Sequence, residues 1–253
     1  MTRWLGEAST PERHFPHIPI QITDMQIANR LPKRKSRTLK RVPAILVGGL
    51  AASIASIALF GKISDEVLEH ESMLFDTRLV EVARKMRSPA LDTTMSVITA
   101  TGEPWAISLV GGIVALKWLS DERRADIATL LLAAGGGGIV NQLLKLLFRR
   151  ERPVLKLRRA HASGYSYPSG HPMTTLAAYG TVAYLVSRRG NLTHHPRDGL
   201  VWAPTILLCG LVGWSRVYLE VHYPTDVIGG WAAGTIWLTT CGIARSFMEP
   251  EES

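Results

Sequence analysis

The sequence has 253 residues, and its 29 Lys and Arg against 21 Asp and Glu give it a net charge of +8. Because the basic residues lie between apolar runs rather than along one face, we expect no nucleic-acid partner. The two cysteines, Cys209 and Cys241, are too few for a disulfide scaffold. The mean hydropathy of +0.10 averages a polar beginning with strongly apolar segments, which follow here in chain order.

The chain begins with a polar segment, residues 1–42, which holds nine Lys or Arg residues, seven of them within residues 30–41. A cleavable signal peptide is not expected, because this leader is too long and the apolar run behind it has the length of a membrane span. We expect a disordered cytoplasmic tail. Its basic cluster would orient the protein in the membrane or attract anionic lipid headgroups.

Six runs without a charged residue follow the tail. Each can be extended at its polar ends towards the roughly 20 residues that a membrane-spanning helix needs, and six such runs argue against a soluble bundle. We therefore predict an all-α polytopic membrane protein, with six transmembrane helices in a domain over residues 43–246 and a short cytoplasmic tail at 247–253. The runs are 42–61, 104–116, 127–144, 172–187, 199–215 and 227–244.

Tryptophan placement supports the membrane interpretation. Trp105 and Trp118 bracket the second run, and Trp202 and Trp214 bracket the fifth. Such pairs are typical of aromatic belts at the two membrane interfaces, although any one of them could be an ordinary core residue.

Three further segments have readable patterns. Residues 65–86 carry apolar side chains at near-helical spacing with charges between them, which predicts an amphipathic helix on the outer interface or a plain surface helix. Residues 93–102 can extend the second run backwards, interrupted only by Glu103. The glycines at 135–138 lack the Gly-Lys-Ser/Thr ending of a phosphate loop, so we expect them to serve close helix packing.

Three polar clusters lie at the ends of the apolar runs. Lys145 and Arg152 are seven residues apart and would share one face if their helix persists as far as Pro153. A helix that starts at Pro172 would place residues 169–171 at its N-terminus, where free N–H groups and the helix dipole favour an anion. With the N-terminus inside and six alternating spans, all three clusters face outside. The clusters are residues 145–153, 168–171 and 215–226.

The third cluster precedes another helix start, at Pro224, which leaves His222 just ahead of the helix and Asp226 in its first turn. Each cluster alone has an ordinary explanation, such as an interface anchor, a loop histidine or a helix cap. Together they supply cations, a helix-end anion site, two histidines and a carboxylate, a set suited to phosphoryl transfer. No metal or other cofactor is expected, because the cations can offset the developing charge.

At this point the motifs carry a family resemblance. K-x6-RP at 145–153, PSGH at 168–171 and SR-x5-H-x3-D at 215–226 resemble the three-part signature of the type 2 phosphatidic acid phosphatase superfamily. That superfamily includes lipid phosphatases and lipid pyrophosphate phosphatases of membranes and, more distantly, soluble acid phosphatases and vanadium haloperoxidases. The resemblance covers roughly residues 43–245, is specific for the superfamily, and says little about the substrate.

The resemblance implies a role for each motif residue. His222 would be the nucleophile that forms a phosphohistidine, Asp226 would orient its ring, and His171 would be the general acid for the leaving oxygen. Cations, a hydroxyl and backbone N–H groups would bind the phosphoryl oxygens. The phosphate-binding residues would be Lys145, Arg152, Ser169, Gly170 and Arg216.

We therefore expect an integral membrane phosphatase, in a bacterial inner membrane with its active site outside, that hydrolyses a lipid phosphate. Phosphatidic acid, phosphatidylglycerol phosphate and undecaprenyl pyrophosphate present the same terminal group to these residues, so the lipid stays open. One alternative is a phosphotransferase with an acceptor other than water. Another is a non-catalytic protein that binds or transports phospholipids, which is less expected because both histidines and the carboxylate are present. The oligomeric state is left open.

Overall fold

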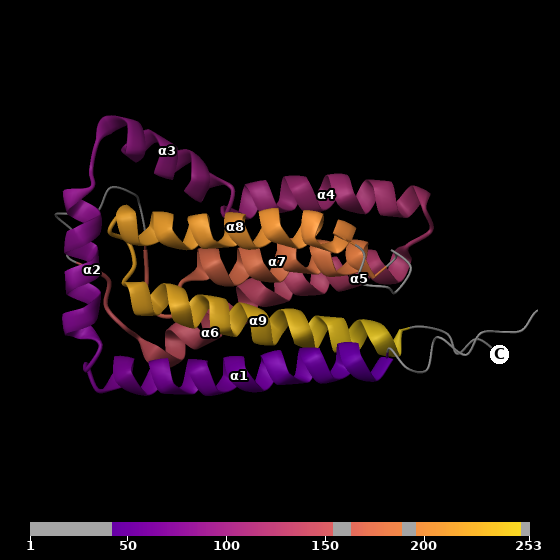
Figure 1. Cartoon of the computed structure of the whole chain (residues 1–253), viewed down its shortest axis with the longest axis horizontal. Coiled ribbons are helices and arrows are strands. Elements are labelled where there is room, and N and C mark those ends of the chain that lie inside the picture. Colours follow the sequence, from indigo (N-terminus) through magenta and orange to yellow (C-terminus); the bar gives the residue numbers. More distant parts are fainter. Residues whose placement is uncertain (1–41, 154–162, 189–195, 249–253) are drawn as a thin grey trace, which may run out of the picture. The chain divides into compact units, whose positions relative to one another are not determined.

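The computed structural model describes residues 42–153, 163–188 and 196–248, and all regular elements within them are helices (Figure 1). The polar tail predicted for residues 1–42 lies outside this part of the chain except for its last residue. Most of the tail predicted for residues 247–253 lies outside it too. The all-α class is confirmed for the described residues.

All six charge-free runs are helical. Prolines begin three of these helices, since the first helical position needs no N–H donor. The third run contains a π-helical turn, η1, between two α-helices. The elements are α1 (Val42–Leu68), α4 (Pro104–Ser120), α5 (Arg124–Leu131), η1 (Leu132–Gly136), α6 (Gly137–Phe148), α7 (Gly170–Ser187), α8 (Pro196–Tyr218) and α9 (Pro224–Phe247).

By length and hydropathy, three continuous helical stretches among the described residues can cross a membrane, namely Arg124–Phe148, Leu200–Tyr218 and Pro224–Phe247. A fourth span is possible if α3 (Pro89–Ala100) and α4, which are bent by 52° relative to each other, cross the membrane together. The predicted number of six spans therefore stays a prediction.

Helix α7 packs against α8 and α9 and forms the centre of the bundle (Figure 1). Small residues allow the close approach: a Cβ added at Gly234 of α9 would lie 2.9 Å from the Met173 carbonyl oxygen of α7. Packing through small side chains is the usual way in which helices associate inside a membrane.

The glycines at 135–138 also serve close packing, as predicted, through two of their members. A Cβ at Gly136 would lie 2.5 Å from the Trp237 ring of α9, and one at Gly137 would lie 3.3 Å from it. The Trp237 indole nitrogen donates to the Ala133 carbonyl oxygen of the π-helical turn at 3.1 Å. The π-helical turn therefore packs against Trp237, as expected for glycines that serve helix packing rather than phosphate binding.

Two of the sequence predictions need correction. Residues 65–86 are not one helix, because α1 ends at Leu68 and a turn with a positive φ of 62° at His70 precedes α2 (Met73–Lys85). This turn sends α2 across the end of the bundle, against α8 and α9 (Figure 1). Residues 93–102 do not simply lengthen the second run, because α3 ends at Ala100 and a new helix begins at Pro104.

Helix α9 connects the two ends of the bundle. Asp226 lies in its first turn and Arg245 in its last. At a rise of 1.5 Å per residue, these two residues are about 28 Å apart along the helix axis. At the far end, Arg123 and Arg245 each bind the Asp126 carboxylate at 2.6 Å. We call these the histidine end, which contains His222 and Asp226, and the arginine end, which contains Arg123 and Arg245.

Candidate active site

The three polar clusters of the sequence meet at the histidine end. Lys145 is in the last turn of α6, His171 in the first turn of α7, and Arg216 in the last turn of α8. His222 lies in the loop that joins α8 to α9. Lys145, Arg152, Arg216 and His222 all lie close enough to His171 to interact with it electrostatically.

His222 is buried between a carboxylate and a guanidinium. Its Nδ1 lies 3.3 Å from Asp226 Oδ2, and its Nε2 lies 3.0 Å from Arg152 Nη1. A guanidinium can only donate, so Nε2 accepts and carries no proton. The proton of the neutral ring is therefore on Nδ1, directed at Asp226, and Nε2 has the lone pair that a nucleophile needs.

Electrostatics keep this ring neutral. Burial lowers the pKa of His222 well below its ordinary value, and the nearby Arg152, Arg216 and Lys145 lower that pKa further. A protonated imidazole cannot attack phosphorus, so the environment preserves the reactive form at neutral pH.

Asp226 is held on both of its oxygens. Oδ2 accepts the backbone N–H of Tyr223 at 2.8 Å, which caps α9, and Oδ1 accepts Arg150 Nη1 at 2.7 Å. The position of His222 four residues before Asp226 brings its ring over the same carboxylate. Asp226 is fully buried, so these donors replace the water that an ionised carboxylate requires.

Arg150 continues this network to α2. Its Nη2 binds Asp76 Oδ2 at 2.6 Å, and Asp76 accepts the backbone N–H of Thr225 at 3.0 Å and its hydroxyl at 2.6 Å. The Arg150 guanidinium also lies 4.5 Å above the centre of the Tyr223 ring. Sequence reasoning missed both Arg150 and Asp76. For Asp76, the sequence offers one hint of a buried role: its carboxylate lies on the apolar side of a predicted surface helix.

The predicted shared helical face of Lys145 and Arg152 is wrong. Helix α6 ends at Phe148, and Arg149 adopts the left-handed conformation with φ of 48°. Arg152 instead reaches the site from a loop, where its guanidinium donates to three carbonyl oxygens at 2.8–3.0 Å. These carbonyls belong to Ser163, Gly164 and Val221. Lys145 and Arg152 still lie close enough to interact electrostatically.

The α7 N-terminus also differs from the prediction. The helix begins at Gly170 rather than at Pro172, because a proline is tolerated throughout the first turn, where N–H groups have no partner in the helix. Ser169 occupies the N-cap position without a capping hydrogen bond from its side chain, and its backbone N–H donates to the Asp226 carbonyl oxygen at 2.9 Å, so this N–H is not available to a ligand. Its fully buried hydroxyl has no hydrogen-bond partner among the described residues.

Arg216 is a second buried donor with unused capacity. Its Nη1 donates to Thr99 Oγ1 at 2.7 Å, whereas its Nε has no partner in the described part of the chain. Buried polar groups are nearly always hydrogen-bonded, so unused donors need an explanation. The Ser169 hydroxyl and Arg216 Nε are therefore buried donors that could bind the oxygens of an anion.

His171 binds a residue outside the three motifs. Its Nε2 lies 3.2 Å from Oε1 of Glu103, which precedes α4.

No group of three His, Cys, Asp or Glu side chains is arranged to hold a metal ion within the described ranges.

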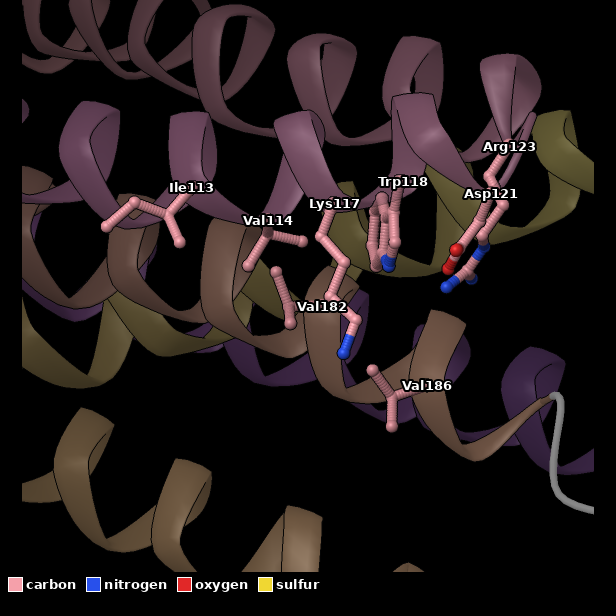
Figure 2. A pocket seen from close by; sticks show the side chains of 8 residues that line it. All are labelled: Ile113, Val114, Lys117, Trp118, Asp121, Arg123, Val182 and Val186. Atoms are coloured by element: carbon pink, nitrogen blue, oxygen red, sulfur yellow. The ribbon is translucent and has the colours of Figure 1, made fainter.

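A hollow between helices α4 and α7, near the arginine end, differs chemically from the site at the histidine end. It has a volume of about 400 Å³. Figure 2 shows the Lys117 side chain running from α4 towards Val182 and Val186 of α7. Its lining contains no histidine, and Arg123 at its edge stacks on Trp118 at 4.2 Å. This hollow therefore lacks the groups for phosphoryl transfer.

Comparisons with known proteins agree with the site. The sequence model of the PAP2 superfamily matches residues 126–246, which include all three clusters. Phosphatidylglycerophosphatase B of Bacillus subtilis is 33% identical over 162 residues, covering 64% of this chain and 78% of that protein. The chain therefore belongs to the PAP2 superfamily.

Two further similarities agree with this membership. Undecaprenyl-diphosphatase of Sulfolobus acidocaldarius is 39% identical over 132 residues, 50% of this chain and 58% of that protein. The crystal structure of a transmembrane PAP2-type phosphatidylglycerolphosphate phosphatase from Bacillus subtilis superposes with a TM-score of 0.72 at 24% identity, covering 79% of this chain and 98% of that one. The fold is that of an integral membrane protein.

Proposed function

We propose that this protein is a membrane phosphatase that hydrolyses a lipid phosphate through a phosphohistidine at His222. One observation carries the proposal: the unprotonated Nε2 of His222 lies 3.0 Å from the Arg152 guanidinium, and Arg216 and Lys145 also lie close enough to act on this ring electrostatically. Membership of the PAP2 superfamily supports the same chemistry.

In the first step, His222 Nε2 attacks phosphorus, and the bond from phosphorus to the leaving oxygen breaks. The proton stays on Nδ1 of His222, and the Asp226 carboxylate that accepts its hydrogen bond stabilises the positive charge that develops on the ring. Lys145, Arg152 and Arg216 bind the three non-bridging oxygens electrostatically. In our proposal the Ser169 hydroxyl and the α7 N-terminus at Gly170 complete this phosphate-binding set.

His171 acts on the leaving side. It gives a proton to the leaving oxygen, so that the lipid departs as an alcohol or as a lipid phosphate. In the second step it accepts a proton from the water that attacks the phosphohistidine. The nitrogen–phosphorus bond then breaks, inorganic phosphate leaves, and both histidines return to their starting state.

Two named substrates are represented among the relatives, a phosphatidylglycerophosphate and an undecaprenyl diphosphate. A lipid is favoured over a soluble phosphate ester because the site lies at the end of apolar helices. The lipid tail can therefore stay in the bilayer while the headgroup enters the site.

We further propose six spans over residues 43–246, with the histidine end outside a bacterial inner membrane and both tails in the cytoplasm. The rise of α9 between its terminal charged groups, about 28 Å, is close to the thickness of the hydrocarbon core. Lys and Arg are enriched at cytoplasmic ends. Both ends of the bundle carry basic residues, but Lys145, Arg152 and Arg216 at the histidine end belong to the proposed phosphate site, whereas the arginine end gathers five basic residues alongside three acidic ones. The five are Lys117, Arg123, Arg124, Arg188 and Arg245.

The test is phosphate release by purified protein in detergent, with EDTA present, from phosphatidic acid, phosphatidylglycerol phosphate and undecaprenyl diphosphate. His222→Asn should abolish release. His70→Asn is the matched control, because His70 is an exposed histidine whose positive φ asparagine tolerates. Equal release by wild type and His222→Asn would refute the assignment of the nucleophile.

Stoichiometry separates the hydrolase from the phosphotransferase. A hydrolase releases one inorganic phosphate for each dephosphorylated lipid, whereas a transferase releases less phosphate when an acceptor alcohol is present. Binding of the lipids without release would favour the non-catalytic alternative.

A further inference from the structure

The break between α3 and α4 enters the active site, although it lies outside all three motifs. Thr99, before the break, accepts a hydrogen bond from Arg216 Nη1 at 2.7 Å, and Glu103, after it, binds His171 Nε2 at 3.2 Å. The break is held in place, because the Tyr179 hydroxyl of α7 donates to the Thr101 carbonyl oxygen at 2.7 Å. A Cβ added at Gly102 would lie 2.9 Å from Cδ2 of His171.

Glu103 therefore lies on the leaving-group side of the site. In a displacement at phosphorus, the leaving oxygen lies opposite the attacking atom, so it lies away from His222 and next to the general acid. A general acid must come within about 3 Å of that oxygen. Since the Glu103 carboxylate already lies 3.2 Å from His171 Nε2, its oxygens and the leaving oxygen become close neighbours.

The two candidate substrates differ in what they leave behind. A phosphate monoester such as phosphatidic acid releases an alcohol, which is neutral once His171 has protonated it. A diphosphate releases a lipid monophosphate, which carries a charge of about −1.5 to −2 at neutral pH. A carboxylate beside the leaving oxygen repels the second product and not the first.

We infer that Glu103 is a specificity determinant that favours phosphate monoesters over diphosphates by repelling an anionic leaving group. The inference rests on the proposed function and deepens it by naming the preferred substrate class. Glu103 is well placed for this role, because 41% of its side chain is exposed, whereas only 16% of the His171 side chain is. It can therefore meet the incoming lipid while His171 stays enclosed.

The test compares kcat/KM for undecaprenyl diphosphate with kcat/KM for phosphatidic acid, in one detergent, for wild type and Glu103→Gln. Glutamine keeps the size of the side chain and its acceptor oxygen for His171, and removes only the charge. The ratio of diphosphate to monoester kcat/KM should rise about tenfold, the size of a Coulomb repulsion between neighbouring charges at an effective dielectric constant of about 20 after a discount for exposure.

Two variants make the test specific. Glu103→Asp retains the charge and should keep the ratio near the wild-type value. Glu71→Gln removes an exposed carboxylate from the turn before α2 and should leave the ratio unchanged.

The outcomes are distinct. A ratio that stays within twofold of wild type in Glu103→Gln, including an equal fall of both rates, would mean that Glu103 only positions His171, and would overturn the inference alone. If wild type releases phosphate from neither lipid, the proposed function and the inference both fail. A raised ratio in Glu103→Gln together with a low one in Glu103→Asp supports the inference.

Discussion

Arg150 donates from Nη1 to Asp226 Oδ1 at 2.7 Å, on the oxygen that does not face the His222 ring. The Arg150 side chain is 8% exposed, and it binds Asp76 of α2 with its other terminal nitrogen. Asp226, which orients the nucleophile in the proposed mechanism, is thus itself linked through Arg150 to α2, a helix that lies across the end of the bundle.

Arg150→Gln tests this support. We expect kcat to fall about 10- to 100-fold with little change in KM, the usual size for the loss of a group that orients a functional side chain. Two buried carboxylates would also lose their cation, which should destabilise the protein by about 3–5 kcal/mol. Steady-state kinetics and chemical denaturation in detergent measure the two effects. Arg149→Gln, which alters the exposed neighbour, should change neither, and equal behaviour of the two variants would contradict the prediction.

The role of His171 can be read from the dependence on the leaving group. His171→Asn should lower kcat/KM for phosphatidic acid by about 10²- to 10⁴-fold, because an alkoxide leaves poorly without a proton. The loss should be much smaller for p-nitrophenyl phosphate, since p-nitrophenolate leaves without protonation. If both substrates lose activity equally, His171 contributes to binding rather than to proton transfer.

The lowered pKa of His222 links its protonation to stability. Below about pH 6.5, the ordinary value for histidine, the unfolded chain binds a proton at this position that the folded protein does not. The free energy of unfolding therefore falls as the pH is lowered, by at most about 1.4 kcal/mol per pH unit from this group.

His222→Asn lacks this contribution. Its Tm should depend less on pH than that of wild type between pH 7.5 and 5, so that acidification favours the variant in the comparison. Both proteins share all other titrating groups, which isolates His222. Parallel Tm curves would show that the ring is not held neutral.

Gly230 tests the contact between α9 and the phosphate-binding turn. A Cβ at this position would lie 2.6 Å from the Ser169 carbonyl oxygen, a backbone atom that can move only if the start of α7 moves. Gly230→Ala should cost about 1–3 kcal/mol of stability and should lower kcat as well. Gly210→Ala is the control, because nothing lies within 4 Å of its added Cβ, and it should keep full activity. Full activity of Gly230→Ala would show that the turn tolerates displacement.

The sequence predicted what local rules decide. Pro224 begins a helix, as predicted, because a proline suits the first helical position, and Asp226 therefore falls in the first turn of that helix. The all-helical class follows from the long runs without charge. Buried Cys209 and Cys241 also agree with their apolar surroundings.

The remaining features depend on contacts between distant segments. Arg150 meets Asp76 across 74 positions of the chain, and His171 meets Glu103 across 68. Neither pair leaves a periodic pattern in the sequence. The shared helical face expected for Lys145 and Arg152 is wrong, since the left-handed residue Arg149 ends the helix and Arg152 contacts His222 from a loop.

The contact between Arg152 Nη1 and His222 Nε2 has a chemical consequence of its own. In the proposed mechanism, this hydrogen bond occupies the lone pair of Nε2 before the substrate binds, so His222 cannot attack until the bond is broken. Breaking it requires a ligand with enough negative charge to draw the guanidinium onto its own oxygens. A neutral electrophile cannot provide that exchange, so the proposed mechanism would select anionic substrates before any bond is made.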